Sequence, residues 1–364
     1  MQPNNIAQNK TNAPKEWNKD RALLLIAEAD IKDRFSFVES IFCASKFVVQ
    51  IKNITKHYLL STLIQRYKLK QSLAVEYAAL KKCLANIDYL FLSNTEGFIS
   101  RNLVRWIRRD FPNIMILGLQ HGIFLLENRK FRTLLLAWAN KSTEKIFDFE
   151  FFGQGFINKN VDYFIVYGSF YKSALVAHGI PAQRVLMSTE ILKGKTFFEQ
   201  RDIFSSSNNN CIFLLQCLSA LAITDKQSET KLIASMLEWL SAKYDIVFVK
   251  QHPYCTIDLP DMPGNCRIVD GSISDIAKNA GIAVSFFSEA LLECEFLGLR
   301  TIAIFSNRLK VSLSVYHLFP TVWAIDKNWQ LMQDHRFNRK YEYYESYLST
   351  PRELLEAVAQ GERM

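Results

Sequence analysis

Two short stretches of the chain combine residue types that bind phosphate. The motif Lys250-Gln251-His252-Pro253 follows a strand-like run at residues 244–249, and Ser285 and Ser288 lie between a second such run and a helix-like segment. Lysine supplies a point charge and histidine a directional donor to phosphate oxygens. A helix start adds free N–H groups and the positive end of a dipole. We therefore predict a pocket for a phosphate or diphosphate group.

Each of these residues also has a plainer structural interpretation. A histidine before a proline is commonly a loop residue where a strand ends, and serine is a favoured N-cap. A capped helix start still binds anions, so the two roles are compatible. Glu293 lies five residues after Ser288 and faces either solvent or the ribose of a nucleotide, which carboxylates commonly bind. The residues predicted to bind the donor are Lys250, His252, Pro253, Ser285, Ser288 and Glu293.

The first half of the chain holds two candidates for a general base. Gln120-His121-Gly122 follows an apolar run at residues 114–118, and Glu96 follows another at residues 89–92. Near neutral pH an imidazole or a carboxylate suits the removal of a proton from a hydroxyl. Both residues also fit structural roles, a turn histidine and an exposed loop carboxylate. No Asp-x-Asp motif lies in an expected strand-end loop, which favours a reaction without a metal or other cofactor.

Apolar runs of four to six residues alternate with helical patterns along the chain. Such runs are typical of parallel strands covered on both faces. Residues 205–210, Ser-Ser-Ser-Asn-Asn-Asn, have the composition of a linker. We predict an α/β fold with two doubly wound, Rossmann-like domains facing a central cleft. The expected parts are a disordered tail at 1–20, an acceptor-side domain at 21–200, and a nucleotide-donor-binding domain at 205–364 whose closing helix crosses back to the first domain.

The second half resembles the donor half of bacterial GT-B glycosyltransferases of surface-polysaccharide assembly. The similarity is to capsule Kdo transferases, bacterial sialyl- and polysialyltransferases, and CDP-glycerol glycerophosphotransferases. In these families a K-x-H-P element and an S-S/T…L-E-A-L-x-x-G element bind the nucleotide phosphates and ribose. Residues 250–253 and 285–298 are similar to them, with Phe287 in place of the first serine of the usual pair and Cys294 in place of the alanine.

The same resemblance implies roles in the first half. Residues 118–122 are similar to a Q/W-H-G element on the acceptor side of the cleft. Thr95-Glu96-Gly97 resembles an acidic element that supplies the general base, although Thr95 stands where the first acid would be. Because its motif is complete, His121 is the preferred base over Glu96.

The resemblance implies a metal-independent, inverting transfer from a nucleotide-sugar donor to a bacterial surface glycan or a lipid-linked acceptor. A donor of the type CMP-Kdo, CMP-sialic acid or a related nonulosonate is favoured. Other interpretations remain open: a UDP- or GDP-sugar or CDP-glycerol transferase, an enzyme like UDP-GlcNAc 2-epimerase, or a catalytically degenerate protein that binds glycans as a scaffold.

The net charge of +8 is unevenly placed. Residues 1–150 hold 23 Lys and Arg against 14 Asp and Glu, a net charge of +9, which leaves about −1 for the remainder. The excess indicates an anionic partner of the first domain or only a solvated surface. Four arginines at helical spacing are candidates for contact with anionic lipid headgroups or an anionic glycan: Arg101, Arg105, Arg108 and Arg109. Nucleic acid is not expected, because no known binding module occurs.

Seven cysteines occur, several inside apolar runs and none in a Cys-x-x-Cys pair. Buried thiols in a reducing cytoplasm are the expectation. No apolar run reaches the roughly 18–20 residues of a membrane span. We therefore expect a cytoplasmic protein, with a peripheral position on the inner face of the cytoplasmic membrane as an option.

Overall fold

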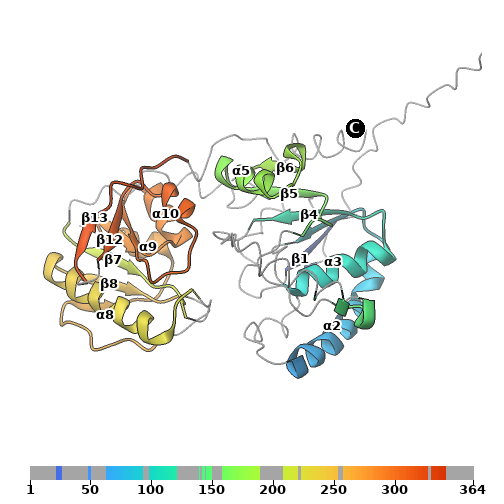
Figure 1. The fold of residues 1–364 in the computed structure, drawn as a ribbon, viewed down its shortest axis with the longest axis horizontal. Helices are drawn as coiled ribbons and strands as arrows, with labels where there is room; N and C mark the ends of the chain where they lie inside the picture. The colour runs from blue at the N-terminus through green and yellow to red at the C-terminus, as the bar shows by residue number, and fades with distance from the viewer. Residues whose placement is uncertain are drawn as a thin grey trace, which may run out of the picture.

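The computed structural model contains two separate β-sheets, which lie in different halves of the molecule (Figure 1). The structure describes residues 22–26, 48–50, 63–92, 98–120, 139, 142–143, 145–149, 158–188, 208–219, 223–252, 257–326 and 329–341. The predicted tail, the segment 189–207 that contains the predicted linker, and the expected closing helix lie outside these residues. The domain boundaries therefore stay predictions.

The first sheet has six strands in the order β2-β1-β3-β4-β5-β6, and every pair is parallel. Its strands are β1 Ala22–Ile26, β2 Val48–Gln50, β3 Tyr89–Leu92, β4 Met115–Leu119, β5 Tyr163–Val166 and β6 Val185–Met187. The helices in this half are α2 Leu63–Leu84, α3 Phe98–Asp110, α5 Ser169–Ala177 and the short 3-10 helix η3 Ala182–Arg184.

The second sheet has seven strands in the order β13-β12-β11-β10-β7-β8-β9. All pairs are parallel except β12 with β13. The strands are β7 Cys211–Leu214, β8 Val247–Lys250, β9 Cys266–Ile268, β10 Ile282–Ser285, β11 Arg300–Phe305, β12 Val322–Ile325 and β13 Leu331–Gln333. The helices are α8 Lys226–Lys243, α9 Ile273–Ala277, α10 Glu289–Phe296 and the 3-10 helix η4 Leu313–Leu318.

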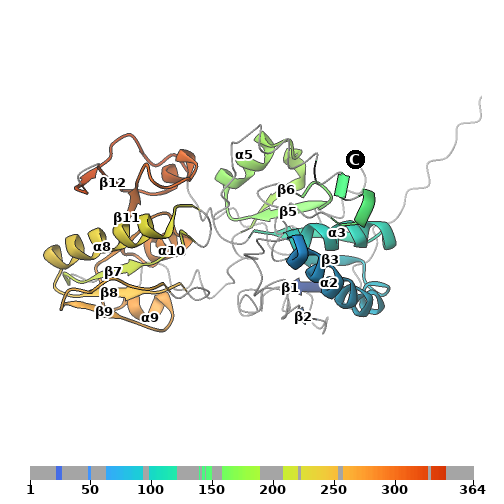
Figure 2. The ribbon, with the colours of Figure 1, turned by 60° about the horizontal axis from the view of Figure 1, so that its bottom comes forward.

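Consecutive buried residues explain why these segments form central strands. All four residues of β7 and of β10 are buried, as are the last five of β11. A strand that buries successive side chains needs cover on both faces. Figure 2 shows α8 and α9 on opposite faces of the second sheet. After β7 the chain moves along the sheet toward β9, and after β9 it returns to the other side of β7 to form β10. Because connections between parallel strands are right-handed, the helices of these two stretches lie on opposite faces of the sheet.

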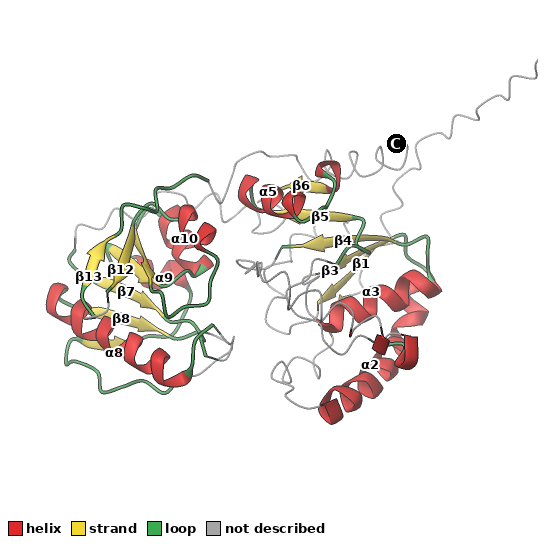
Figure 3. Ribbon diagram, in the orientation of Figure 1, coloured by secondary structure: helices red, strands yellow, loops and turns green. Residues whose placement is uncertain are grey.

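Each sheet has one position where the strand order reverses. In the second sheet, β8 and β9 lie to one side of β7 and β10 to β12 to the other, which is the Rossmann order. In the first sheet, β1 lies between β2 and β3, as in flavodoxin-like sheets. Ligands of such sheets bind at the carboxyl ends of the strands beside these positions. The predicted class, two doubly wound α/β domains, is confirmed (Figure 3).

The chain returns toward the first domain after its last strand. The ring of Tyr341 lies 5.1 Å from the ring of Phe170 in α5, centroid to centroid. A crossing back is thus present at Tyr341.

The cysteines agree only in part with the expectation of buried thiols. Cys211, Cys266 and Cys294 are free and buried, and Cys83 is free and partly exposed. Burial raises the pKa of the Cys211 and Cys294 thiols. The expectation is wrong for Cys217, which is disulfide-bonded. The cysteines therefore no longer argue for a reducing compartment.

Candidate functional site

Three strand ends form one row at the carboxyl edge of the second sheet. Leu214 of β7 pairs with Lys250 of β8. On the other side of β7, the Ser285 hydroxyl donates a hydrogen bond to the Leu214 carbonyl at 2.8 Å. Lys250 and Ser285 therefore flank β7 where the strand order reverses, so the two motifs that lie far apart in sequence meet at one edge.

Lys250 is held toward the loop between β9 and α9. Its ammonium group donates to the Gly271 carbonyl at 2.7 Å. An ammonium group has three donors, so this contact leaves two for a ligand. His252 lies two residues beyond the end of β8 and is partly exposed. Pro253 lies outside the described residues.

Ser285 has an internal role. Its side chain is fully buried, and its single proton goes to the Leu214 carbonyl. The hydroxyl also lies 3.4 Å from Oε1 of Gln216. Ser285 thus ties β10 to β7 and does not present its hydroxyl at the surface, in contrast to the predicted phosphate contact.

Gln216 is a positioning residue that the sequence reasoning missed. Its Oε1 accepts the backbone N–H of Phe287 at 3.0 Å. Phe287 is buried, so this hydrogen bond fixes the loop between β10 and α10 on its buried side. A polar residue directly after a buried strand run was the signal that could have found it.

Ser288 is the N-cap of α10, as expected. Its hydroxyl accepts the backbone N–H of Ala290 at 3.2 Å. Glu293 lies in the same helix and is partly exposed. A capped helix start next to the reversal of strand order is a favourable place for an anion.

The start of α8 is arranged differently. Asp225 caps it by accepting the Ser228 N–H at 2.8 Å, and the hydrogen bonds from Ser228 lower the pKa of Asp225. Glu229, in the first turn, is buried and accepts the Ser219 N–H at 3.1 Å together with the Ser219 hydroxyl. The chain's own carboxylates, Asp225 and Glu229, therefore occupy this positive helix end. Helix α10 carries one carboxylate in its first turn, Glu289. The role of Glu229 was not predicted from the sequence.

Both candidate bases, His121 and Glu96, lie outside the described residues. The strands that precede them in sequence are described: Leu92, the last residue of β3, pairs with Gly118 of β4. Gln120 is buried, and its Oε1 accepts the Tyr167 N–H at 2.9 Å. The residue before His121 is thus anchored at the carboxyl edge of the first sheet.

Arg108 does not form part of a free arginine stripe. Its guanidinium donates to the carbonyls of Asn160 at 3.0 Å and Ile114 at 2.7 Å, and it pairs with Asp162. These contacts tie α3 to the segments that lead into β4 and β5. Three of the five guanidinium donors of Arg108 are thus used inside the domain. Contact of Arg108 with an anionic surface stays a prediction.

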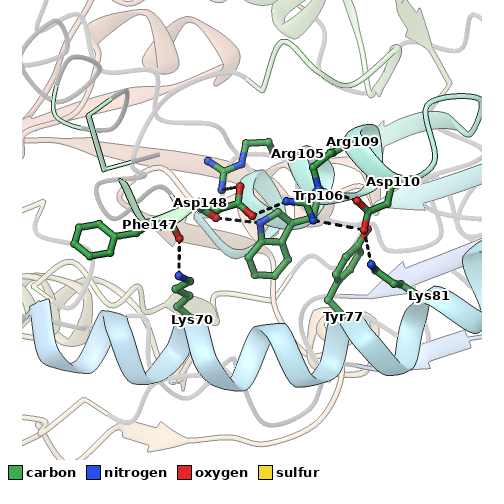
Figure 4. Close-up of polar contacts among 9 residues, drawn as sticks. All are labelled: Lys70, Tyr77, Lys81, Arg105, Trp106, Arg109, Asp110, Phe147 and Asp148. Atoms are coloured by element: carbon green, nitrogen blue, oxygen red, sulfur yellow. Dashed lines mark hydrogen bonds and ion pairs between the residues drawn. The ribbon is translucent and has the colours of Figure 1, made fainter. Parts of the chain in front are cut away.

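Arg105 and Arg109 both pair with Asp148, at 3.4 and 2.6 Å (Figure 4). Arg109 also contacts Asp110 at 2.7 Å, which in turn pairs with Lys81 of α2 at 2.6 Å. The hydrogen bond from Arg109 holds the pKa of Asp110 far below its usual range. Arg109 and Asp110 therefore link α3 to Lys81 of α2, and Arg105 links α3 to Asp148. Contact of these two arginines with an anionic surface stays a prediction. Arg101 is partly exposed.

The described residues contain neither a cluster of metal ligands nor a membrane-spanning helix. Within the described ranges, no three His, Cys, Asp or Glu side chains gather closely enough to hold a metal ion. Among the same residues, no helix combines the length and apolar character needed to cross a bilayer.

The amino-acid sequence matches the model of a known protein family. The sequence model of the alpha-2,8-polysialyltransferase (POLYST) family matches residues 5–260, well over half of the chain. The protein is therefore a glycosyltransferase, as predicted. It belongs to the alpha-2,8-polysialyltransferase family. No curated protein matches the sequence.

Several solved structures are similar in outline. The wall teichoic acid polymerase TagF has 9% identity and a TM-score of 0.43 over 78% of this chain and 69% of that chain. UDP-GlcNAc 2-epimerase from Neisseria meningitidis has 11% identity and a TM-score of 0.38 over 78% and 82% of the two chains. The glycosyltransferase SnogD from Streptomyces nogalater has 10% identity and a TM-score of 0.40 over 78% and 82%. At these identities and TM-scores, the three structures do not indicate the substrate of this protein.

Proposed function

We propose that this glycosyltransferase builds bacterial surface polysaccharide by moving a CMP-linked sugar acid, a sialic acid, Kdo or a related nonulosonate, onto a glycan or lipid-linked acceptor. The observation that carries the proposal is the family match together with the row of Lys250, Leu214 and Ser285 at the carboxyl edge of the second sheet. The row places a cation and a capped helix start on the two sides of one strand.

The proposed division of labour follows from this arrangement. Lys250, His252 and the start of α10 bind the phosphate of the donor. An acceptor hydroxyl attacks the anomeric carbon from the opposite side, and the bond from that carbon to the phosphate oxygen breaks. The electron pair leaves with CMP, whose added charge the lysine and the helix start stabilise without a metal. His121, or Glu96 in its place, takes the proton of the acceptor hydroxyl.

Calorimetry is the direct test of the donor. Titration with CMP, CDP, UDP and GDP should give the tightest binding for CMP. A preference for CDP, UDP or GDP would move the proposal to a glycerol phosphate, UDP-sugar or GDP-sugar transferase. Epimer formation from UDP-GlcNAc without an acceptor would favour an epimerase, and binding of none would favour a glycan-binding scaffold.

We also propose that the first domain docks on the inner face of an anionic membrane, through a surface other than the arginines. We define the α2 patch as Tyr67, Ile146 and Phe147, whose side chains are 46%, 73% and 41% exposed. Lys70 donates to the Phe147 carbonyl at 2.5 Å and lies 6.0 Å from the Tyr67 ring centroid, which brings Tyr67 and Phe147 to one surface; Ile146 is the residue before Phe147 in the chain. Figure 4 shows Lys70 reaching from α2 to this carbonyl.

The charge around the α2 patch supports a lipid partner. Helix α2 carries five basic residues and one acidic residue, and Lys145 beside Ile146 is exposed. Exposed apolar side chains among lysines fit the interface of an anionic bilayer, where the side chains insert between headgroups and the lysines meet their charge.

A further inference from the structure

A second cation lies at the carboxyl edge of the second sheet, outside both sequence motifs. Arg308 follows the end of β11 by three residues, and its guanidinium carbon lies 4.3 Å from the ring centroid of Trp329. Trp329 belongs to the turn between β12 and β13. Because β10, β11 and β12 are parallel neighbours, this pair lies at the same edge as Ser288 and Lys250.

The segment that carries Arg308 is anchored on both sides. The Arg308 N–H donates to the hydroxyl of Ser306, a fully buried residue, at 3.3 Å. Two residues further on, the Lys310 N–H donates to the Ile223 carbonyl at 2.9 Å. Ile223 lies between β7 and α8, so the arginine segment lies against the loop that follows the central strand of the site.

Trp329 adopts a left-handed backbone conformation within this turn. Its φ is 65°, in the region where glycine is favoured and a bulky residue is an outlier. The Trp329 N–H donates to the Asp326 carbonyl at 3.3 Å, and Asp326 and Gln330 exchange hydrogen bonds of 3.0 and 2.9 Å, which close the turn. Glycine would meet these backbone demands with less strain, so an indole kept at this position points to a function for its ring.

The contact holds the guanidinium of Arg308 over the indole ring of Trp329. Among the described residues, no carboxylate or carbonyl accepts a hydrogen bond from the Arg308 guanidinium. Arg336 is a useful contrast: it also lies over an aromatic ring, Phe305, at 5.5 Å, but its fork is occupied by Asp334. Lys310, two residues after Arg308, is an exposed cation that adds to the positive charge of this segment.

We propose that Arg308, oriented by Trp329, binds an oxyanion of the nucleotide-sugar donor. The planar fork of arginine matches both groups that such a donor carries, the carboxylate of a sugar acid and the phosphate. This inference rests on the proposed function, and it adds a donor-binding residue in the loop after β11, outside both sequence motifs.

The test is calorimetry with CMP, CMP-N-acetylneuraminic acid and CMP-Kdo on the full chain. Arg308→Ala should weaken binding of at least one CMP-sugar about tenfold to a hundredfold, the usual effect of losing a hydrogen bond between charged groups. Arg308→Lys should recover only part of the loss. Arg300→Ala is the matched control, because Arg300 begins the same strand at the opposite edge and is exposed.

Trp329→Gly removes the ring that orients Arg308. Glycine suits a φ of 65°, but the indole also packs against the core, so CMP-sugar affinity is measured well below the melting temperature of the variant and should fall. Loss for the CMP-sugars but not for CMP assigns the carboxylate, and equal loss for all three assigns the phosphate. If the wild type binds CMP-sugars and Arg308→Ala binds them equally well, the role of Arg308 is excluded while the proposed function stands. If the wild type binds none of the three, the proposed function fails and the inference with it.

Discussion

The side chain of Gln216 shows how much a single residue contributes beneath the candidate site. It is the acceptor for the buried N–H of Phe287, 71 positions further along the chain. No ligand needs to touch it for the site to depend on it, because the loop that it holds leads directly into the cap of α10.

Gln216→Ala should lower both stability and donor affinity. The substitution leaves the Phe287 N–H buried without its acceptor, which costs about 1–3 kcal/mol. Gln216→Glu keeps an acceptor oxygen and should retain more stability than the alanine variant. Thermal unfolding and CMP titration measure the two effects. Equal melting temperatures for the wild type and Gln216→Ala would show that this bond does not fix the loop.

Substitution of the two predicted histidines, His252 and His121, should affect CMP affinity and turnover differently. His252→Ala should weaken CMP binding and turnover together, because a phosphate partner acts on the bound donor and on the leaving group. His121→Ala should leave CMP affinity nearly intact and lower turnover by about 10²–10⁴, the usual effect of losing a general base.

Glu96→Ala serves as the comparison for the base. If it alone loses turnover with CMP binding intact, Glu96 is the base. Near-normal turnover in both variants, with folding intact, would place the base at a different residue.

At the scale of elements, the packing of α2 on α3 depends on the ionised state of Asp110. The pKa of Asp110 is lowered by Arg109 and Lys81, so its contribution is complete above the unfolded value of about 3.9 and is lost progressively as pH falls from that value through the lowered pKa of the folded state. Burial, together with the Asp110 carboxylate, raises the pKa of Tyr77 beside it.

Asp110→Asn should therefore reduce the melting temperature at pH 7 and shrink the difference between pH 7 and pH 3. Asp258→Asn is the control, since Asp258 pairs with Lys226 at 2.9 Å but both side chains are largely exposed, and such pairs contribute little. The same pH dependence in the wild type and Asp110→Asn would assign the acid sensitivity to other carboxylates.

The α2 patch is the element expected to meet the membrane. Exchanging both Ile146 and Phe147 for serine should reduce cosedimentation with phosphatidylserine vesicles at low salt. Exchanging Leu313 and Met332, exposed to a similar degree in the second domain, should have no effect. Wild-type binding should also weaken as salt rises. Binding that stays unchanged in high salt would exclude an electrostatic contribution, and absence of binding at low salt would exclude the docking proposal.

At the scale of the molecule, the fold could be predicted because its signal is local. Runs such as residues 211–214 and 282–285 bury every side chain, and continuous apolar runs distinguish parallel strands from half-exposed ones. The capping role of Ser288 was equally visible, since the cap and its partner are two residues apart.

The rest could not be predicted because it depends on partners that are distant in sequence. Arg105 to Arg109 looked like a free stripe, yet Asp148 and Asp162 lie tens of residues away. The burial of Ser285 was predictable from its strand, but not the carbonyl that takes its proton, 71 residues earlier. A role for Arg308 was not predicted, because its contact with Trp329 joins residues that are far apart in the sequence.

The contact between Tyr341 and Phe170 has a mechanical meaning. The polypeptide passes between the two halves once after β6, and the ring contact of 5.1 Å marks a second passage. Two connections restrict the relative motion of two bodies more than one connection does. The segment that ends at Tyr341 therefore joins the second sheet, which carries Lys250, to α5 of the first domain by a link separate from the chain that follows β6.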